Sequence, residues 1–533
     1  MTEQTGPLRE PDSSGDSVAR TDVVVIGGGI AGLTTARDLG ARGYRVTLLE
    51  ASEAVGGVVQ GHEIAGLQLD RGAESFAVRG GGVAALLHDL ELDDAIVRPE
   101  RRPAWLQLKE RAVPLPKGGL LGIPTTPLAK DVIAVLGWGG AFRAYADRLI
   151  PIVKLGRETS LGDLVRRRMG QRTLDRLVSP VAGGVYSASA HDLDVDAISP
   201  GLNPALTRAG SLSGAAAQVR ASSDQAGSAV QGLHGGMHRL TAALRRELER
   251  FLVELRLQER ATGIAAEEEG WRVETVAADG TKTRMHARSL VIATPGEQAR
   301  DLLAQLPETA SALGEQWGES PTIELVTLVV DAPALDAFPR GAGMLVAEDA
   351  GRKAKALTHA TAKWEWLREA AAGRHVVRVS FGRAGAPPAT ATLSDDEAIA
   401  LAKSEAEIML GVPLGTVIGA KRVRYEQAQP AAQLGIAAQR ARLLDAITPI
   451  ETLEVVGAWV SGTGLASVIP QARAAAKRIR REHFAVPGQG WVDEMLQAGE
   501  PENPAATGEA TGGEASPAPQ MFKESDHEQG DKQ

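Results

Sequence analysis

Glycines spaced for binding a phosphate group follow the first hydrophobic segment of the chain. The run from Gly27 to Gly32 fits G-x-G-x-x-G, directly after the β-branched segment 21–26 and directly before the helix-forming segment 30–39. In this context the first glycine permits a tight turn, the second lets the backbone approach a pyrophosphate, and the third lets helix and strand pack closely. The N–H groups and dipole at the helix N-terminus attract an anion. The run therefore predicts a dinucleotide site, with a purely structural glycine turn as the alternative.

An acidic residue completes this pattern. Glu50 ends the predicted strand 44–50 and stands eighteen residues after Gly32, where a carboxylate can accept hydrogen bonds from a ribose diol. Strand, glycines, helix, strand and acid form a β-α-β unit of about thirty residues. This unit does not distinguish FAD from NAD(P).

Later segments favour FAD. Glu50-Ala51 with Gly56-Gly57 resembles the E-A-x-x-x-x-G-G doublet of the flavin amine-oxidase superfamily, and 291–295 resembles the A-T-P that ends another strand of its cofactor domain. A lone A-T-P also has a purely structural interpretation. A strand is predicted over 453–459, followed by a small-residue loop and a helix beginning near Ala466. The N-terminus of that helix would face the flavin pyrimidine and stabilise the anionic reduced ring.

Segments outside these motifs carry a more specific resemblance. Four segments match further patterns. They are 72–79, which resembles G-x-[DE]-S-F-x-x-R, 115–125, which resembles P-K-G-x-x-x-G-I-P-T, 177–186, which resembles L-x-x-P-x-x-x-G-x-Y, and 232–237, which resembles G-L-x-G-G-[LM]. These patterns are similar to those of the FAD-dependent protoporphyrinogen and coproporphyrinogen oxidases of haem synthesis, in particular their soluble bacterial branch, over most of residues 22–480. The departures concern the substrate side. Ser187-Ala188-Ser189 replaces A-G-D, 424–436 retains little of R-W-x-x-x-x-P-Q-Y-x-x-G-H, and 462–468 differs from G-V-G-I-P-D-C.

The resemblance implies oxidation of coproporphyrinogen III to coproporphyrin III. Six electrons would leave the porphyrinogen in three flavin cycles, each passing a hydride equivalent to FAD and two electrons on to O2, with hydrogen peroxide released. The flavin supplies the difficult chemistry, so no catalytic residue is named. The substrate carboxylates need cations, which arginine forks supply well. Arg79 and Lys117 are the candidates by motif position. The cluster Arg98, Arg101 and Arg102 is a third candidate, for which a solvated charged loop is the favoured interpretation, and the run 166–168 is interpreted as solvated.

Several alternatives stay open. Protoporphyrinogen IX differs from the favoured substrate by two vinyls in place of two propionates, so a protoporphyrinogen oxidase has the same motifs. Another amine oxidase would need an aromatic cage, for which four tyrosines are few, and a desaturase would need a membrane face. A flavoprotein that binds porphyrin without turnover is the non-enzymatic alternative. An NAD-dependent dehydrogenase is disfavoured by the Gly56-Gly57 doublet.

The composition of the chain excludes several classes of protein and of binding site. The 533 residues carry a net charge of -9, of which residues 499–533 contribute -6, so there is no basic excess for nucleic acid. The absence of cysteine excludes disulfides, iron–sulfur clusters and thiol nucleophiles, and no histidine spacing predicts a metal site. A polar N-terminus without an apolar signal segment predicts a cytoplasmic protein. The uncharged stretch 132–142 is too short to span a bilayer; a buried helix with a glycine break is expected there, with peripheral membrane contact as the alternative.

The predicted fold is α/β (α+β), with a Rossmann-like FAD-binding domain interleaved with a mixed-sheet substrate domain and a mostly helical lobe. We expect a disordered tail over 1–19, FAD-binding parts at 20–85, 226–300 and 446–485, a helical lobe with part of the substrate domain at 86–225, a substrate-binding domain at 301–445, and a disordered acidic tail at 499–533.

The candidate site residues follow from these motifs. Those for FAD are Gly27, Gly28, Gly29, Ile30, Ala31, Gly32, Glu50, Ala51, Gly56, Gly57, Gly72, Ala73, Glu74, Ser75, Ala261, Tyr425, Thr463, Gly464 and Leu465, and those for the porphyrinogen are Arg79 and Lys117.

Overall fold

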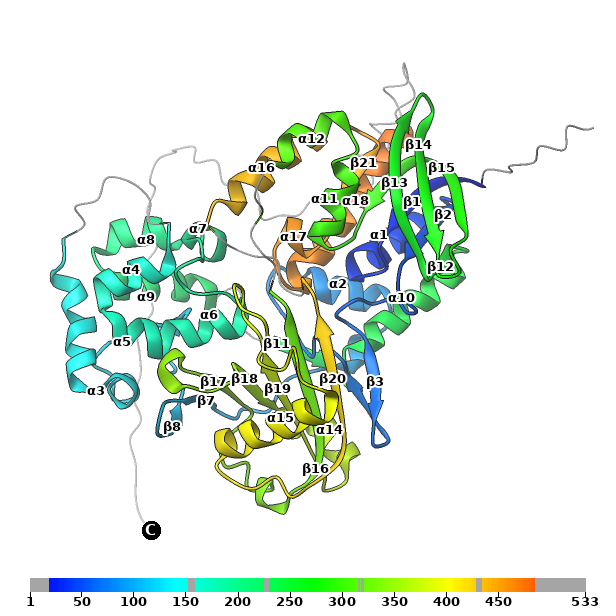
Figure 1. The fold of residues 1–533 in the computed structure, drawn as a ribbon. Coiled ribbons are helices and arrows are strands. Elements are labelled where there is room, and N and C mark those ends of the chain that lie inside the picture. Colours follow the sequence, from blue (N-terminus) through cyan, green and yellow to red (C-terminus); the bar gives the residue numbers. More distant parts are fainter. Residues whose placement is uncertain are drawn as a thin grey trace, which may run out of the picture. The chain divides into compact units, whose positions relative to one another are not determined.

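Two seven-stranded sheets and a group of helices form the computed structural model of the chain (Figure 1). The structure describes residues 19–151, 159–224, 230–314, 317, 321–427 and 434–484. The predicted tails lie outside the described residues, apart from Ala19.

The first sheet is mostly parallel. Its order is β12-β2-β1-β15-β14-β13. Strand β21 pairs with Leu290–Ile292 of β15, beyond the part of β15 that pairs with β14. Strands β12, β2, β1, β15 and β21 are parallel, whereas β13 and β14 form an antiparallel extension. The strands are β1 (Ala19–Ile26), β2 (Val46–Glu50), β12 (Glu254–Leu257), β13 (Glu259–Glu267), β14 (Gly270–Ala277), β15 (Lys282–Ile292) and β21 (Leu453–Val455).

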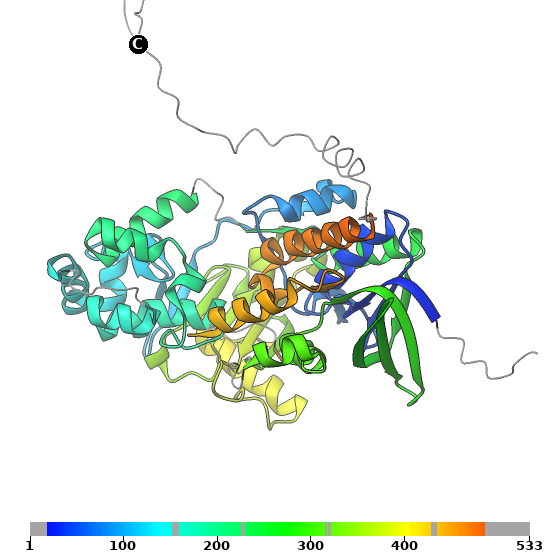
Figure 2. The ribbon, with the colours of Figure 1, turned by 90° about the horizontal axis from the view of Figure 1, so that it is seen from above.

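Helices cover both faces of this sheet, which is why its central strands are continuous hydrophobic runs. Val23 and Val25 pack towards α1, α10 and α18, and Val24 and Ile26 pack towards α11 and α16. In Figure 2, α18 runs beside α2, where Arg473 pairs with Asp89. These helices are α1 (Ile30–Gly40), α2 (Gly82–Asp89), α10 (His238–Arg250), α11 (Gly296–Leu303), α12 (Pro307–Leu313), α16 (Ile436–Ile447) and α18 (Leu465–Phe484).

The predicted β-α-β unit is confirmed by β1, α1 and β2. The strand predicted over 453–459 is wrong beyond Val455. Gly457 has a φ of 124° and starts the one-turn helix α17 (Ala458–Ser461), and a residue with a side chain adopts such a φ only rarely. The following helix begins at Leu465.

The second sheet is antiparallel except where β17 runs parallel to β7. Its order is β20-β16-β19-β18-β17-β7-β8. Helix α15 packs on one face through Ala402, Ala406 and Met409. The elements are β7 (Ala104–Gln107), β8 (Ala112–Pro114), β16 (Ile323–Asp331), β17 (Gly343–Val346), β18 (Ala356–His359), β19 (His375–Phe381), β20 (Thr416–Tyr425) and α15 (Asp395–Leu410).

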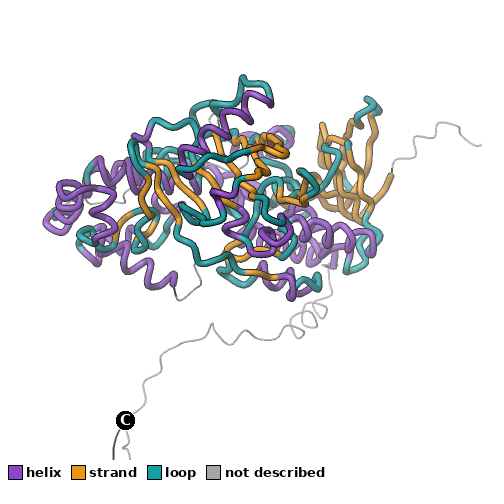
Figure 3. Tube along the Cα trace, turned by 90° about the horizontal axis from the view of Figure 1, so that it is seen from below, coloured by secondary structure: helices purple, strands orange, loops and turns teal. Residues whose placement is uncertain are grey.

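A helical lobe follows β10 (Ile123–Pro124) in the chain. Arg166 and Arg167 in this lobe are exposed, as expected, but the interpretation of Arg168 as solvated is wrong. Figure 3 shows this group almost entirely as helices. Arg168 is only 4% exposed, and its Nε lies 2.5 Å from Oδ1 of the fully buried Asp147. Ser213 donates its backbone N–H to the other oxygen of that carboxylate. The lobe contains α3 (Lys130–Tyr145), α4 (Leu161–Met169), α5 (Gln171–Thr173), α6 (Ser179–Val185), α7 (Val195–Ile198), α8 (Leu202–Ala209) and α9 (Leu212–Asp224).

Helix α3 contains the stretch 132–142, and the structure confirms the glycine break but only part of the burial. Gly137 has a φ of 68° and interrupts the helix. Val135 is fully buried, whereas Trp138 and Phe142 are 62% and 56% exposed. Within the described ranges, every helix is too short or too polar to cross a bilayer.

Short elements join these parts. They are β3 (Gly61–Ile64), β4 (Leu67–Asp70), β5 (Phe76–Ala77), β6 (Ile96–Val97), β9 (Gly119–Leu120), β10 (Ile123–Pro124), β11 (Val230–Leu233), α13 (Ala360–Lys363) and α14 (Glu365–Ala371).

Candidate functional site

A cavity of about 720 Å³ joins the glycine-rich loop after β1 to a face of the second sheet. Loops that follow β1, β2, β15 and β21 line one part, and residues of β16, β18, β19 and β20 line the other. Ligands of open α/β sheets bind beyond the carboxyl ends of the parallel strands. The predicted residues that line this cavity are Gly27, Gly29, Ile30, Ala31, Glu50, Gly56, Gly57, Gly72, Ala73, Glu74, Ser75, Tyr425, Thr463, Gly464 and Leu465.

The glycine loop leaves room where a side chain would otherwise stand. A Cβ on Gly27 would come within 2.7 Å of the Ala293 carbonyl oxygen, and a Cβ on Gly32 would overlap the Gly27 carbonyl. A Cβ on Gly29, by contrast, would meet nothing within 4 Å. Gly29 is the N-cap of α1 and lines the cavity. The loop therefore forms an open cradle at a helix N-terminus, which fits a phosphate group.

The glycine doublet after β2 packs against this loop. Gly56 donates its N–H to the Gly28 carbonyl at 2.7 Å, and Gly29 and Gly56 form an isolated parallel bridge. Gly56 and Gly57 have φ values of 111° and 58°, which disfavour any residue with a Cβ. The two predicted glycine motifs thus form one wall of the cavity.

Glu50 is held at the edge of this wall. Its Oε2 accepts the Gly28 N–H at 2.8 Å, and its Oε1 accepts the Ser52 N–H at 2.8 Å and the Ser52 hydroxyl at 2.6 Å. A carboxylate oxygen has two lone pairs, so the positioned Oε2 retains capacity for a ligand hydroxyl. The predicted residues Gly28, Gly32 and Ala51 are not among those that line the cavity.

The segment 72–75 brings a buried acid to the cavity. Lys363 Nζ lies 2.6 Å from Glu74 Oε1, and Arg378 Nη1 lies 3.7 Å from Glu74 Oε2. Burial by itself raises the pKa of the Glu74 carboxyl, but the charges of Lys363 and Arg378 outweigh it, so this pKa lies below its usual value. Arg378 also donates to the Gly72 carbonyl at 2.7 Å.

Three buried polar atoms of cavity-lining residues have no hydrogen-bond partner among the described residues. They are Thr294 Oγ1, Tyr425 Oη and Trp459 Nε1. Burial raises the pKa of the Tyr425 hydroxyl to about 12, so this group is a neutral donor. Unsatisfied buried groups are rare in proteins, and these three, with the open cradle at Gly29, fit a polar ligand such as a flavin dinucleotide.

The other predicted residues lie elsewhere. Ala261 pairs with Thr275 in the sheet and packs against the cluster under α11. Arg79 is exposed, and it donates to Ser467 Oγ in the first turn of α18 at 3.2 Å. Lys117 is exposed and outside the cavity lining. Arg102, interpreted above as solvated, lies 3.8 Å from the Phe338 ring centroid.

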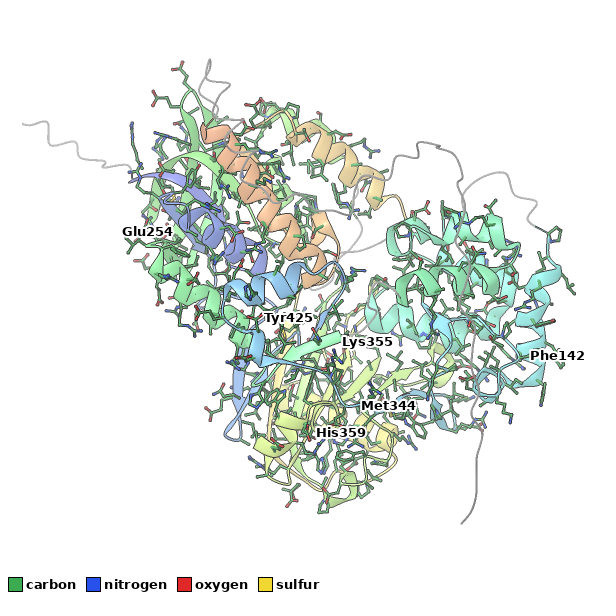
Figure 4. All side chains as sticks on the ribbon, turned by 180° about the vertical axis from the view of Figure 1, so that it is seen from behind. Phe142, Glu254, Met344, Lys355, His359 and Tyr425 are labelled. Atoms are coloured by element: carbon green, nitrogen blue, oxygen red, sulfur yellow. The ribbon has the colours of Figure 1, made fainter. Side chains whose placement is uncertain are left out.

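The cavity wall contains a lysine that no sequence motif indicates. Lys355 is 5% exposed and donates from Nζ to Ser187 Oγ at 2.5 Å. Burial, with a smaller effect from the charge of Arg383, lowers the pKa of its ammonium group to about 7. Figure 4 labels Lys355 and Tyr425, which line the same cavity, whereas Phe142 lies at the outer edge of the helical lobe. The sequence signal nearest to this lysine is the departure from A-G-D at Ser187, its hydrogen-bond partner.

Known proteins resemble this chain over most of its length. A coproporphyrinogen III oxidase of Mycobacterium tuberculosis (strain ATCC 25618 / H37Rv) is 31% identical over 460 residues, 85% of this chain and 96% of that protein. A coproporphyrinogen III oxidase of Bacillus subtilis (strain 168) is 24% identical over 473 residues, 86% of this chain and 98% of that protein.

Solved structures show the same fold. A protein from Exiguobacterium sp. 255-15, provisionally assigned as a protoporphyrinogen oxidase, has a TM-score of 0.74 at 24% identity and covers 87% of this chain and 99% of its own. Wild-type putrescine oxidase bound to putrescine has a TM-score of 0.60 at 18% identity, over 88% of this chain and 99% of its own. The sequence profile of the flavin containing amine oxidoreductases matches residues 30–480. The chain therefore belongs to the family of flavin-containing amine oxidoreductases, and a flavin is its cofactor.

Proposed function

We propose that this protein is an FAD-dependent coproporphyrinogen III oxidase. The reaction converts coproporphyrinogen III and three O2 into coproporphyrin III and three hydrogen peroxide, with six electrons and six hydrogens leaving the macrocycle. The observation that carries the proposal is one cavity that joins the glycine cradle to an apolar wall with a buried cation. The names of the relatives above support the choice of substrate.

The chain would hold FAD through the residues that its motifs predict. Gly27 to Gly29 and the N-terminus of α1 suit the pyrophosphate, and Glu50 suits the ribose. Residues 463–465, at the N-terminus of α18, suit the pyrimidine end of the ring, where a helix dipole favours negative charge. When bound, the flavin accepts the hydride equivalent from the substrate.

The protein then has to bind and orient the porphyrinogen. Ile323, Leu325 and Leu357 offer an apolar wall for the macrocycle. Arg79 is exposed and donates to Ser467, the residue before the cavity-lining Val468. Its guanidinium suits a propionate. Because a bound flavin would supply the hydride acceptor, no acid–base pair of side chains is assigned, and Lys117 stays a prediction by motif alone.

Side-by-side oxidation assays test this proposal. The purified holoprotein is mixed in air with coproporphyrinogen III or protoporphyrinogen IX, and porphyrin fluorescence and peroxide are recorded against a protein-free control. Faster oxidation of coproporphyrinogen with about three peroxides per porphyrin is the expected result. Faster oxidation of protoporphyrinogen would make the protein a protoporphyrinogen oxidase.

A second measurement separates an enzyme from a binding protein. Anaerobic coproporphyrinogen should bleach the flavin absorbance in a proposed oxidase. A yellow protein that binds porphyrin, shows no bleaching and does not exceed autoxidation would refute the catalytic assignment.

A further inference from the structure

Lys355 occupies an unusual position for a charged side chain. Its backbone is fixed, because its N–H donates to the Ser380 carbonyl at 2.9 Å and its carbonyl accepts the Val346 N–H at 3.2 Å. The residue therefore stands between β17 and β19, just before β18, and its side chain reaches the cavity wall. Figure 4 labels it between the second sheet and the helical lobe, and its partner Ser187 follows α6 of that lobe.

The other buried cations of the described residues have acidic partners. The buried lysine and arginine residues there are Arg168, Lys355 and Arg378, which are 4%, 5% and 9% exposed. Arg168 pairs with Asp147 and Arg378 with Glu74. The neighbours that act on Lys355 are instead a hydroxyl and a second cation, Ser187 and Arg383. Within the described ranges it has no carboxylate at ion-pair distance.

These surroundings are unfavourable for an ammonium group. A buried ammonium group loses its hydration, and that loss is recovered only when an opposite charge or several hydrogen bonds replace the water. Arg383 makes the site more positive, because its guanidinium lies near Lys355 and is itself only half-buried. A cavity with unpaired positive charge of this kind is suited to an anionic ligand.

The surroundings of Lys355 narrow the class of anion. Ser187 and Ser380 add hydroxyl groups, and Leu325 and Leu357 line the same cavity with apolar surface. A carboxylate has the right chemistry for an ammonium group and neighbouring hydroxyls. The apolar residues suit the hydrophobic body that bears the carboxylate.

We propose that Lys355, with Ser187 as hydrogen-bond partner and Arg383 as a nearby positive charge, is the binding site for one carboxylate of the substrate. The inference rests on the proposed function, in which that carboxylate is a propionate of the porphyrinogen. It makes Lys355 a substrate-binding residue at the wall opposite the glycine cradle, distinct from the cations that the motifs single out.

Ligand binding by the holoprotein tests the assignment. Coproporphyrin III is stable in air and carries four carboxylates, and its tetramethyl ester carries none. Fluorescence quenching gives Kd for both ligands in the same detergent. Lys355→Met removes the charge, Lys355→Arg retains it, and Lys353→Met is the matched control because Lys353 is exposed two residues away.

We expect Lys355→Met to weaken coproporphyrin binding by about tenfold or more, the effect of one charged hydrogen bond. Binding of the ester should stay unchanged in all variants, and Lys355→Arg and Lys353→Met should bind the acid within about threefold of the wild type. Removing an unpaired buried charge is not expected to unfold the protein, which flavin content and thermal unfolding check. Equal losses for acid and ester, or none for either, would overturn the proposal.

Proton uptake is an independent measurement. With its pKa lowered to about 7, Lys355 is mostly neutral at pH 8 when no ligand is bound, and a bound carboxylate favours the charged form. Calorimetry in two buffers of different ionisation enthalpy should show more protons taken up by the wild type than by Lys355→Arg. Equal uptake by both would contradict the assignment.

These results separate the two proposals. Charge-dependent binding without turnover would leave the carboxylate site standing and refute the oxidase. Turnover by Lys355→Met with an unchanged preference for acid over ester would leave the oxidase standing and refute the site.

Discussion

Replacing Gly29 by alanine should weaken flavin binding by about a hundredfold or more without disturbing the fold. Gly29 has φ -70° and ψ 176°, which alanine adopts freely. An added Cβ would meet no atom within 4 Å, and it would occupy cavity space in front of the α1 N-terminus. The variant therefore fills the cradle while leaving the surrounding contacts intact.

The magnitudes for folding and binding differ. Alanine at an N-cap is less favourable than glycine by up to about 1 kcal/mol, and the lower entropy of the unfolded chain returns about 0.4–1 kcal/mol. The free energy of unfolding of the flavin-free protein should thus change by less than about 1 kcal/mol. Binding should lose roughly 1.5–3 kcal/mol for a displaced charged hydrogen bond and about 1–3 kcal/mol for overpacking, which together correspond to about a hundredfold or more.

Gly201→Ala is the matched control. Gly201 is also an N-cap, with φ -82° at the start of α8, and an added Cβ would be in ordinary contact with Val219 at 3.6 Å. Urea unfolding of flavin-free protein and titration with FAD give the two quantities for both variants. If Gly29→Ala binds FAD within about threefold of the wild type, the cradle does not receive the pyrophosphate. If it lowers flavin-free stability far more than the control does, the space is not open.

Three further predictions concern buried polar groups. Arg168→Met should lower the free energy of unfolding by about 3–5 kcal/mol because it leaves the Asp147 carboxylate buried without its partner, whereas the exposed Arg166→Met should stay within about 0.5 kcal/mol; urea denaturation at pH 7 compares them. The pKa of Glu74 in the folded protein lies below its ordinary 4.5. Its ionised form therefore stabilises the protein above pH 4.5, and this contribution is lost as the pH falls through the folded-state pKa. Glu74→Gln should show a shallower loss of stability below pH 4.5, and an unchanged pH profile would contradict the ion pairing. Tyr425→Phe should stabilise the flavin-free protein by about 1–3 kcal/mol by removing an unsatisfied buried hydroxyl, and weaker FAD binding should accompany it; a destabilised flavin-free variant would show that the hydroxyl has a partner.

The β-α-β unit could be predicted because its signals are local. Strand 21–26, the glycines and helix 30–39 are consecutive, and Gly27 and Gly32 are required by the close approach of the Ala293 and Gly27 backbones. The same holds for the doublet at Gly56. The strand predicted over 453–459 failed for a related local reason, because the apolar residues after Gly457 belong to a turn of helix. Hydrophobic composition alone does not distinguish the two.

The burial of Arg168 had a local signal that composition obscured. Leu161, Leu164 and Val165 are buried in α4, and a residue seven positions after Leu161 returns to nearly the same helix face. The spacing therefore places Arg168 on the buried face. Its acidic partner is Asp147, twenty-one residues earlier. No periodicity within α4 predicts that this carboxylate lies beside the buried face of the helix.

Lys355 illustrates the limit of local reasoning. Lys353 and Lys355 are two positions apart, and in a regular strand they would share a face, yet one is exposed and the other is 5% exposed. The difference arises because β18 begins only at Ala356 and because Ser187, from a segment 168 residues earlier, covers the second lysine. The acid that would neutralise such a group is found beside Arg168 and Arg378 but not beside Lys355. A buried charge is tolerated only when another group compensates it. The lack of a carboxylate beside Lys355 among the described residues is therefore more informative about the chemistry of the ligand than any motif in this part of the chain. Lys353, which is exposed, provides the comparison within the same segment.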